Sequence, residues 1–279
     1  MLVLKRIIAI INLKTYIRNI LLLYVFVNPV YSNSTENMMK VAAVDWCPQI
    51  CPYDKARPGY VIEMFELIFE HSNINYVVDI FPWSRAIKSV HSGNYSALLA
   101  PSKDEAPSLI YPKTPIGFQE MCFYTLKGSL WEYTGESSLK GLSIGVAKDT
   151  SIDEIIDYVE KNPHQFQIQP YHERYINQNI NKLRKGRINT FIFNKNTVEY
   201  LKKSTGNIDD IQNSGCLARK PVYLAFTGRL KNRQKIREFA RLYDKNIQKT
   251  ELNNHIDKIL SHYEIGITLK ELLKYDSSG

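Results

Sequence analysis

The chain has 279 residues, of which 44% are hydrophobic and 23% are charged, and its formal net charge is +8. This length suits one large domain or two small ones, each with an ordinary apolar core. The sequence contains no heptad array, low-complexity tract or repeat of solenoid length. Coiled-coil, disordered and solenoid architectures are therefore excluded.

The first 32 residues predict an export signal. Four residues carry all of the charge in this segment, and all four are basic: Lys5, Arg6, Lys14 and Arg18. The apolar run 19–27 that follows them is too short to span a bilayer by itself. We expect cleavage near Ser32 and release into the periplasm, with an uncleaved membrane anchor as the alternative. Without the four basic residues the charge of +8 becomes +4, an excess too small to predict binding to nucleic acid.

Strands and helices alternate in the first half of the mature chain. Short apolar runs predict strands at 41–46, 74–81 and 95–102. Apolar residues at helical spacing predict helices between them, at 59–73 and 82–93. Three such alternations are typical of a mostly parallel sheet covered by helices, which makes this an α/β protein.

A second alternating series begins near residue 119. Strands are predicted at five places: 119–128, 142–147, 167–172, 188–194 and 221–228. Ser151 lies three residues before Glu154, which is capping-box spacing, so we expect Ser151 to cap the first helix of this series. Two amphipathic helices are expected in 232–263. The pattern indicates one α/β unit, a crossing, a second α/β unit, a return crossing and final helices.

Six segments together resemble a known family. In chain order they are GYVIEMFELIFE, FPWSRAIKSVHSG, YPKTPIG, LKGLSIGVAKDTS, LRKGRINTFIFN and KPVYLAFTG. Their order and approximate spacing resemble those of the periplasmic solute-binding proteins of polar amino acid ABC transporters, the extracellular solute-binding protein family 3. The resemblance covers nearly all of the mature chain. It implies the type II periplasmic binding protein fold, with lobe 1 formed by 33–120 and 222–279, lobe 2 by 121–221, and two crossing strands between them.

The resemblance also implies a function. A protein of this kind is expected to bind a small polar solute between its lobes and to close around it by hinge motion. It would then present the solute to an inner-membrane ABC permease as a monomer, with no cofactor, no metal ion and no chemical reaction. Two alternatives remain. One is an enzyme on the same scaffold, similar to cyclohexadienyl dehydratase, with Glu105 as a general acid. The other is a ligand-sensing partner of a membrane receptor.

Two positions depart from the family pattern. The loop after the third strand usually carries an arginine in a pattern like Thr-x-x-Arg, and here SKDEAP retains Ser102 but places Glu105 at the arginine position. An aspartate usually ends the strand after GR, and here it is Asn194. Because a carboxylate at 105 would repel a ligand carboxylate, an ordinary α-amino acid is not the expected ligand. A shifted alignment, in which Lys103 supplies the positive charge, is the alternative.

Residues expected to bind the ligand combine aromatic faces with polar groups from loops of both lobes. In lobe 1 they are Asp45, Trp46, Tyr53, Trp83, Arg85, Ser102 and Glu105. In lobe 2 they are Lys148, Thr150 and Asn194. For Trp83 the alternative is a place in the core, and for Arg85 it is an ion pair with a structural carboxylate.

Catalytic and metal-binding motifs do not support an enzyme. The string GLSIG at 141–145 matches the G-x-S-x-G pattern of serine hydrolases, but Ser143 lies inside a predicted strand rather than on a strand-to-helix turn. The histidines lack metal-binding spacing, and the sequence contains no Walker loop or dinucleotide fingerprint.

Cys47 and Cys51 stand close together in the stretch DWCPQICPYD. Their spacing is one residue longer than that of a thioredoxin motif, which starts a helix, and here Pro52 follows, which cannot donate a backbone hydrogen bond in a helix interior. A zinc site would need further ligands nearby. In an oxidising compartment we expect a Cys47–Cys51 disulfide, which would fix the loop from 45 to 53. Cys122 and Cys216 lie near the expected crossing strands, and whether they form a second disulfide is left open by the sequence.

Overall fold

A computed structural model describes residues 38–70, 72, 74–172, 174–229 and 233–276. The predicted signal segment, including the cleavage position near Ser32, lies outside these residues. Within the described part of the chain, no helix has the length and apolar character needed to cross a membrane.

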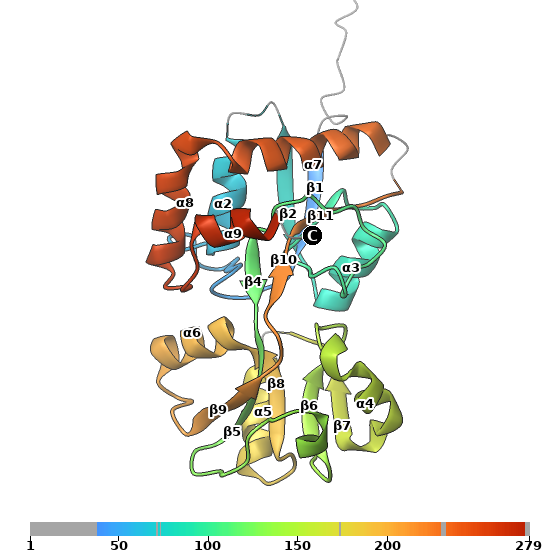
Figure 1. Cartoon of the computed structure of the whole chain (residues 1–279), viewed down its shortest axis with the longest axis vertical. Coiled ribbons are helices and arrows are strands. Elements are labelled where there is room, and N and C mark those ends of the chain that lie inside the picture. Colours follow the sequence, from blue (N-terminus) through green and yellow to red (C-terminus); the bar gives the residue numbers. More distant parts are fainter. Residues whose placement is uncertain (1–37, 71, 73, 173, 230–232, 277–279) are drawn as a thin grey trace, which may run out of the picture. The chain divides into compact units, whose positions relative to one another are not determined.

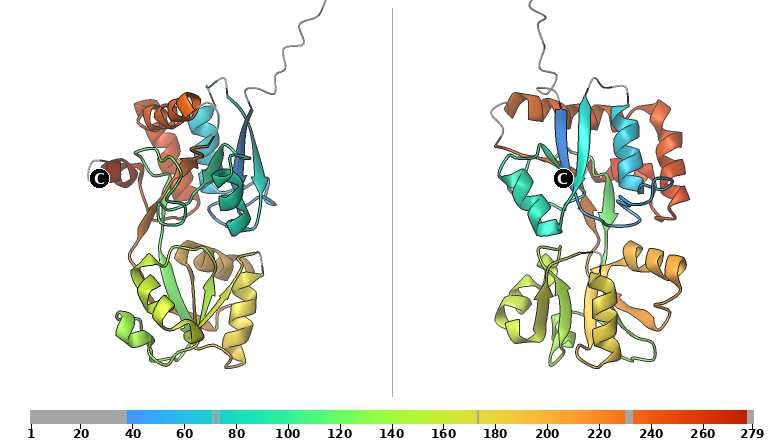
Figure 2. Two further views of the ribbon diagram at one scale, coloured as in Figure 1. Left: turned by 90° about the vertical axis from the view of Figure 1, so that its right-hand side faces the viewer. Right: turned by 180° about the vertical axis from the view of Figure 1, so that it is seen from behind.

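One group of elements, called lobe 1 here, is built on a four-stranded sheet of order β11-β3-β1-β2. In this sheet β1 (Met38–Ala43) pairs in parallel with β2 (Asn75–Ile80) and β3 (Ala97–Leu99), and β11 (Leu224–Phe226) is antiparallel to β3. Its helices are α2 (Tyr60–Phe69), α3 (Trp83–His91), α7 (Arg233–Ile247), α8 (Thr250–His262) and α9 (Leu269–Asp276). Helix α3 packs on β1 and β3, and α2 packs against α7 and α8 (Figure 2).

The second group, called lobe 2, is built on a five-stranded sheet of order β7-β6-β8-β5-β9. Its strands are β5 (Met121–Leu126), β6 (Ile144–Ala147), β7 (Phe166–Gln169), β8 (Thr190–Asn194) and β9 (Ile211–Cys216). Strands β7, β6 and β8 are parallel, whereas β5 is antiparallel to both β8 and β9. The α-helices are α4 (Ile156–Lys161), α5 (Tyr175–Arg184) and α6 (Lys195–Thr205). Three short 3-10 turns, η2 (Glu136–Leu139), η3 (Asp153–Ile155) and η4 (Pro163–Gln165), complete it.

Two antiparallel strands connect the lobes. Strand β4 (Gly117–Gln119) leaves lobe 1 and β10 (Lys220–Val222) returns to it, with Phe118 paired to Pro221 (Figure 1). After β4 the chain enters β5 within two residues. The mixed sheets joined by paired crossing strands form the type II periplasmic binding protein architecture predicted from the sequence.

Apolar spacing explains why these elements form. Helix α2 buries Val61, Met64, Phe65 and Ile68, which recur at three- and four-residue intervals and so share one face. Strand β8 is buried at all five positions, as expected for a strand with neighbours on both sides and helices on both faces. Burial of such side chains contributes roughly 1.5 to 3 kcal/mol each relative to exposure.

The cysteine loop, defined here as residues 46–51, contacts the first turn of helix α2, and Gly59 makes this close contact possible. The carbonyl oxygens of Pro48 and Gln49 accept hydrogen bonds from the amides of Tyr60 (3.1 Å) and Val61 (3.0 Å). These bonds satisfy helix N–H groups that a capping side chain would otherwise take. Gly59 has φ of 107°, and a Cβ atom there would lie 2.4 Å from the Gln49 oxygen. Only glycine fits this position without displacing the loop.

The predicted helix start at Ser151 is wrong. The 3-10 turn η3 begins at Asp153, α4 begins at Ile156, and no capping side chain bonds to either. Glu154 instead accepts hydrogen bonds from Tyr133 Oη (3.1 Å) and the Ala218 amide (2.7 Å), so it ties the segment between β9 and β10 to η3. Long-range partners have replaced the local capping box.

Other predicted elements differ in detail. The expected strand 221–228 is divided into β10 and β11 at Tyr223, whose backbone bonds to Ala100 and Pro101 rather than continuing the ladder. The expected strand 119–128 begins only at Met121, after the crossing strand β4. Strand β9 and helix α9 were not predicted, since IQNSGC lacks alternation and α9 contains only eight residues.

Candidate functional site

Side chains of both lobes line a small cavity of about 30 Å³, which has room for no more than a few water molecules. From lobe 1 and the crossing strand it is lined by Val44, Trp46, Trp83, Ala100, Glu105 and Gln119. From lobe 2 it is lined by Met121, Thr150, Tyr171, Phe193 and Asn194. Both lobes therefore contribute side chains to this small space.

The topology brings these residues together. Val44 follows β1, Ala100 follows β3, Thr150 follows β6 and Tyr171 follows β7, while Asn194 is the last residue of β8. The carboxyl ends of the parallel strands in each sheet therefore face the cavity. This edge is the usual place for a ligand in open α/β sheets.

The cysteine loop positions Trp46. Cys47 and Cys51 form a disulfide with Cα atoms 4.8 Å apart. Beside that ring, Trp46, which precedes Cys47, and Ile50 exchange two backbone hydrogen bonds of 2.8 and 2.9 Å. The ring and the bridge together hold the Trp46 indole at the cavity. This is the disulfide that the sequence predicted.

Asn194 presents a hydrogen-bond donor to this region. Its Oδ1 accepts from the Thr197 amide (3.2 Å), which caps helix α6, and from Gln49 Nε2 (2.9 Å) across the lobes. Because both partners are donors, they fix which end of the amide is oxygen. Its Nδ2 is buried and finds no acceptor among the described residues. An unpaired buried donor is costly, so Asn194 is suited to bind an acceptor atom of a ligand.

Aromatic side chains from both lobes are held by hydrogen bonds to the opposite lobe. Trp83 Nε1 donates to the carbonyl oxygen of Asp149 (2.8 Å), and Tyr171 Oη donates to the carbonyl oxygen of Asp45 (2.7 Å). The Tyr171 ring also stacks on Phe193, with centroids 5.0 Å apart. These bonds exist only while the lobes are together, and they fix the rings against the cavity.

Glu105 is the acidic side chain of the cavity. Its Oε2 accepts from the Ser102 amide (2.8 Å), and Ser102 Oγ donates to Ser151 Oγ in lobe 2 (3.3 Å). Burial raises the pKa of the Glu105 carboxyl to about 7, an effect that hydrogen bonds from Ser102 partly offset. The Gln119 amide lies toward this carboxyl and also lowers its pKa, although no acceptor stands in hydrogen-bonding geometry at Gln119 Nε2.

Charged groups at the rim also join the lobes. Lys220 Nζ lies 3.3 Å from an Asp104 carboxylate oxygen in lobe 1 and 2.6 Å from one of Asp153 in lobe 2. Ser84 Oγ donates to the Asp149 carboxylate. These groups are partly exposed, so each contact contributes about 1 kcal/mol or less.

Five of the residues expected at the ligand line the cavity: Trp46, Trp83, Glu105, Thr150 and Asn194. Two more lie beside it and bond across the lobes: Asp45, through its carbonyl oxygen, and Ser102, through its hydroxyl.

Three of the expected residues lie away from the cavity. Tyr53 is 84% exposed, because Pro52 turns the chain outward after the disulfide. Arg85 is exposed on α3, where its guanidinium stands 5.4 Å from the Phe81 ring centroid. It forms no ion pair with a carboxylate of the described residues. Lys148 is exposed beyond the end of β6.

Sequence reasoning missed the remaining lining residues. Phe193 precedes Asn194 in an all-buried strand, and its aromatic ring was the available signal. Tyr171 lies at the end of a predicted strand, as Trp46 does, so its position was the available signal. Gln119 and Met121 lie where the chain crosses between the lobes, and nothing local distinguishes them.

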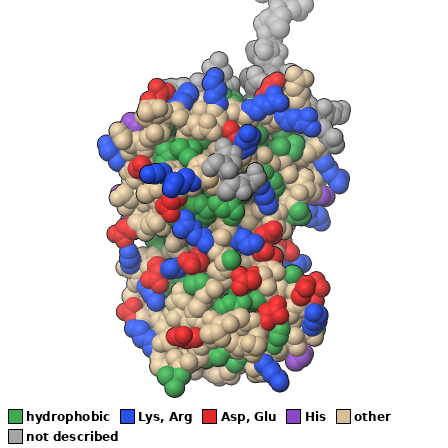
Figure 3. Space-filling model, viewed as in Figure 1, with side chains coloured by type: hydrophobic (Ala, Val, Ile, Leu, Met, Phe, Trp, Pro, Cys, Tyr) green, Lys and Arg blue, Asp and Glu red, His purple; other side chains and the backbone are tan. Residues whose placement is uncertain are grey.

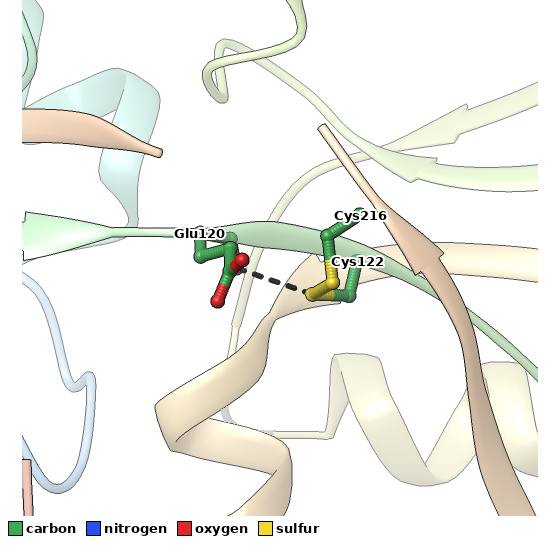
Figure 4. Close-up of side chains that lie close together, drawn as sticks. All are labelled: Glu120, Cys122 and Cys216. Atoms are coloured by element: carbon green, nitrogen blue, oxygen red, sulfur yellow. Dashed lines mark hydrogen bonds between the residues drawn. A yellow bond between two sulfur atoms is a disulfide. The ribbon is translucent and has the colours of Figure 1, made fainter. Parts of the chain in front are cut away.

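Cys122 and Cys216 form the second disulfide, between β5 and β9, with Cα atoms 3.9 Å apart. Glu120 lies beside it (Figure 4), and its carboxylate pairs with Lys195 Nζ at 3.0 Å. Cys122 Sγ stands 3.8 Å from the Glu120 carbonyl oxygen, but a disulfide sulfur has no hydrogen to donate. Cysteine binds metals as a thiolate, so these three residues in this state do not form a metal site.

A larger groove of about 580 Å³ lies between α6, the 263–267 segment and the crossing strands. Two pairs of its charged side chains lie within ion-pair distance, Lys195 with Glu120 and Lys203 with Glu264, and Arg219 pairs with Glu271 beyond the groove. Figure 3 likewise shows basic and acidic side chains interspersed over the described residues of that face. The groove is the weaker candidate, because in the smaller cavity the buried amides of Asn194 and Gln119 have donors without an acceptor among the described residues.

Comparison with known proteins gives structural matches only. No protein-family model matches the chain, and no curated protein matches it. A histidine kinase sensor domain with similarity to periplasmic binding proteins is 13% identical, with a TM-score of 0.67 over 81% of this chain and 95% of that one. A putative L-cystine ABC transporter protein from Listeria monocytogenes is 14% identical, with a TM-score of 0.64 over 81% and 95%.

A further match is an amino acid ABC transporter substrate-binding protein from Streptococcus pneumoniae bound to L-arginine. It is 15% identical, with a TM-score of 0.62 over 82% of this chain and 95% of that chain. At such identities the likeness concerns the fold. The predicted type II periplasmic binding protein fold, and the structural resemblance to ABC transporter substrate-binding proteins, are confirmed.

Proposed function

We propose that this chain is an exported solute-binding protein that captures a small polar solute in the enclosed cavity between its lobes. The observation that supports this most strongly is the composition of the cavity. Each lobe contributes two aromatic rings, and the buried amides of Asn194 and Gln119 offer donors without acceptors. Neither lobe alone supplies a complete site.

Binding would proceed by closure of the lobes about β4 and β10. A space of about 30 Å³ is too small for a solute, so the lobes must separate to admit one and then close over it. A solute favours closure only through contacts that are better in the closed state. The aromatic rings and buried amides that line the cavity from both lobes would supply such contacts to the solute. The bonds from Trp83 and Tyr171 to the opposite lobe stabilise the closed form with or without a solute.

An ordinary α-amino acid does not suit the cavity. None of its described lining residues is Lys, Arg or His, so a ligand carboxylate would find no cationic partner. Glu105 stands there instead, and a second carboxylate beside it would raise the pKa of both groups. We propose a polar solute of another class, delivered in the periplasm to an inner-membrane ABC permease by a monomeric protein without a cofactor.

The proposal is tested by thermal shift and titration calorimetry against a panel of polar metabolites. A bound solute at a hundredfold excess over its Kd should stabilise the protein by about 2.7 kcal/mol. Trp46→Ala should weaken binding at least tenfold, since a buried aromatic contact is worth more than about 1.4 kcal/mol. Tyr53→Ala is the matched control, because Tyr53 follows the same loop but is 84% exposed. A panel without any shift would contradict the proposal.

An enzymatic role is the second candidate, since a carboxyl whose pKa is raised to about 7 is poised for general acid chemistry. The two roles differ in the fate of the bound solute. A binding protein releases it unchanged, whereas an enzyme converts it. Mass spectrometry of the solute after prolonged incubation with the protein distinguishes them, and conversion that Glu105→Gln abolishes would replace binding with catalysis as the function.

A further inference from the structure

We infer that the cavity selects a small organic cation, whose positive charge pairs with Glu105 between the aromatic rings and whose neutral oxygen accepts from the buried amides. This inference rests on the proposed function and names the chemical class of the solute. It follows from three properties of the cavity: its charge, its aromatic walls and its unpaired donors.

The cavity is a negatively charged enclosure. Among its described lining residues, Glu105 is the only carboxylate, and none is Lys, Arg or His. Burying a carboxylate without a positive partner is strongly unfavourable. The nearby cation Lys220 is engaged by Asp104 and Asp153 at the rim. A cationic solute would supply the missing counter-charge, whereas an anionic one would add to the repulsion.

The walls favour an organic cation over a metal ion. Trp46 and Trp83 line the cavity from lobe 1, and Tyr171 and Phe193 line it from lobe 2. Aromatic faces attract alkylated and other weakly hydrated cations, more strongly when water is excluded. Hard metal ions instead require six or more oxygen ligands, which a cavity walled by Val44 and aromatic rings does not offer.

The amides set a second requirement. Asn194 Nδ2 and Gln119 Nε2 are buried donors that find no acceptor among the described residues. The hydrogen bonds to Asn194 Oδ1 from Thr197 and Gln49 prevent the Asn194 amide from turning its oxygen inward. The solute should therefore carry a hydroxyl or carbonyl oxygen in addition to its positive charge.

The groups around Glu105 set its response to pH. Ser102 bonds to the carboxylate within its own loop, and Asp104 beside it pairs with Lys220. The Tyr111 hydroxyl donates to backbone oxygens of the same loop. Outside, a groove of about 410 Å³ is lined by Glu105 and Thr150 together with the side chains of Lys88, His91, Asp104 and Asp149. The Glu105 carboxyl thus stands between the small cavity and this outer groove.

Protons would compete with the cation for Glu105. Because burial raises the pKa of this carboxyl to about 7, it is mostly ionised at pH 8 and mostly protonated at pH 6. If only the ionised form binds the cation, the apparent affinity falls about tenfold between these pH values. Binding of a neutral solute would not depend on this proton in the same way.

The test is titration calorimetry of the full mature chain with four cations and two matched analogues. The cations are choline, tetramethylammonium, putrescine and agmatine. The analogues are 3,3-dimethylbutan-1-ol, which replaces the ammonium nitrogen of choline by carbon, and glycine betaine, in which a carboxylate replaces the hydroxymethyl group of choline. We expect at least one cation to bind, and choline to bind more tightly than both analogues and, because of its hydroxyl, more tightly than tetramethylammonium.

Glu105→Gln should weaken cation binding by about tenfold or more and remove its dependence on pH between 6 and 8. Asp104→Asn is the matched control, since Asp104 is the adjacent carboxylate but does not line the cavity. If Glu105→Gln folds poorly, the pH dependence of the wild-type protein alone gives the same answer. Binding of only neutral or zwitterionic solutes would overturn the inference and leave the proposed function intact. Binding of no solute, in this set or the wider metabolite panel, would remove both.

Discussion

Replacing Cys122 and Cys216 together by serine removes the disulfide that closes the longer of two covalent loops. The cysteines are 94 residues apart, whereas Cys47 and Cys51 are 4 apart. In the chain-entropy model the longer loop stabilises the fold by about 4.7 kcal/mol and the shorter by about 2 kcal/mol. For a chain of this size, the midpoint temperature of unfolding should fall by roughly 10 to 20 °C when the Cys122–Cys216 disulfide is removed. It should fall by roughly 4 to 8 °C when the Cys47–Cys51 disulfide is removed.

For ligand affinity the order should be reversed: removing Cys47–Cys51 should have the larger effect, and removing Cys122–Cys216 the smaller. The Cys47–Cys51 disulfide constrains the loop that carries the Trp46–Ile50 bridge and places an indole at the cavity, so its removal adds an ordering cost to binding. The affinity of that double variant should fall several-fold, while that of the Cys122→Ser, Cys216→Ser variant should change less than twofold. Scanning calorimetry and ligand titration under non-reducing conditions measure both effects. A larger loss of stability from the short loop, or equal losses of affinity, would refute this reasoning.

Three further predictions follow from single positions. Gly59→Ala should lower the unfolding free energy by roughly 2 to 4 kcal/mol in urea unfolding, because alanine there meets both a positive φ and a backbone clash. Gly128→Ala is the control, since Gly128 has a positive φ but open space around it, and its loss of unfolding free energy should be smaller. Equal losses in the two variants would show that the clash contributes nothing. Trp83→Phe keeps an aromatic ring but loses the 2.8 Å hydrogen bond to the Asp149 carbonyl oxygen, so the affinity for the solute should fall about threefold to tenfold. An unchanged Kd would show that this hydrogen bond does not stabilise the closed lobes. Burial raises the pKa of Glu105 from 4.5 to about 7, so the folded state binds this proton more tightly, and the unfolding free energy should fall as the pH rises between those values. Glu105→Gln should reduce this dependence of the unfolding free energy on pH. An identical dependence in both proteins would contradict the raised pKa of Glu105.

The sequence predicted the fold where local patterns determine structure. Helix α2 and strand β8 follow from apolar spacing alone, and the order of strands and helices indicated the α/β units. The capping box at Ser151 failed because Glu154 has more favourable partners elsewhere in the chain. Such long-range bonds are invisible to a rule that considers only the next few residues.

The candidate site was predicted in part for a similar reason. Trp46, Thr150 and Asn194 follow or end predicted strands, so the topology alone directs them to the ligand edge of a sheet. Gln119 lies on a crossing strand, and its place at the cavity depends on how two lobes meet. Tyr53 is only two residues beyond Cys51, yet the turn at Pro52 exposes it. Proximity in sequence does not determine on which side of a loop a side chain lies.

The most direct test of the account is a calorimetric titration of the best-bound solute into the wild-type protein, Trp46→Ala and Tyr53→Ala. The enclosed cavity predicts a stoichiometry of one, at least a tenfold weaker affinity in Trp46→Ala, and an unchanged affinity in Tyr53→Ala. Equal affinities in all three proteins would place binding elsewhere, for instance in the groove beside α6, and would contradict the central claim.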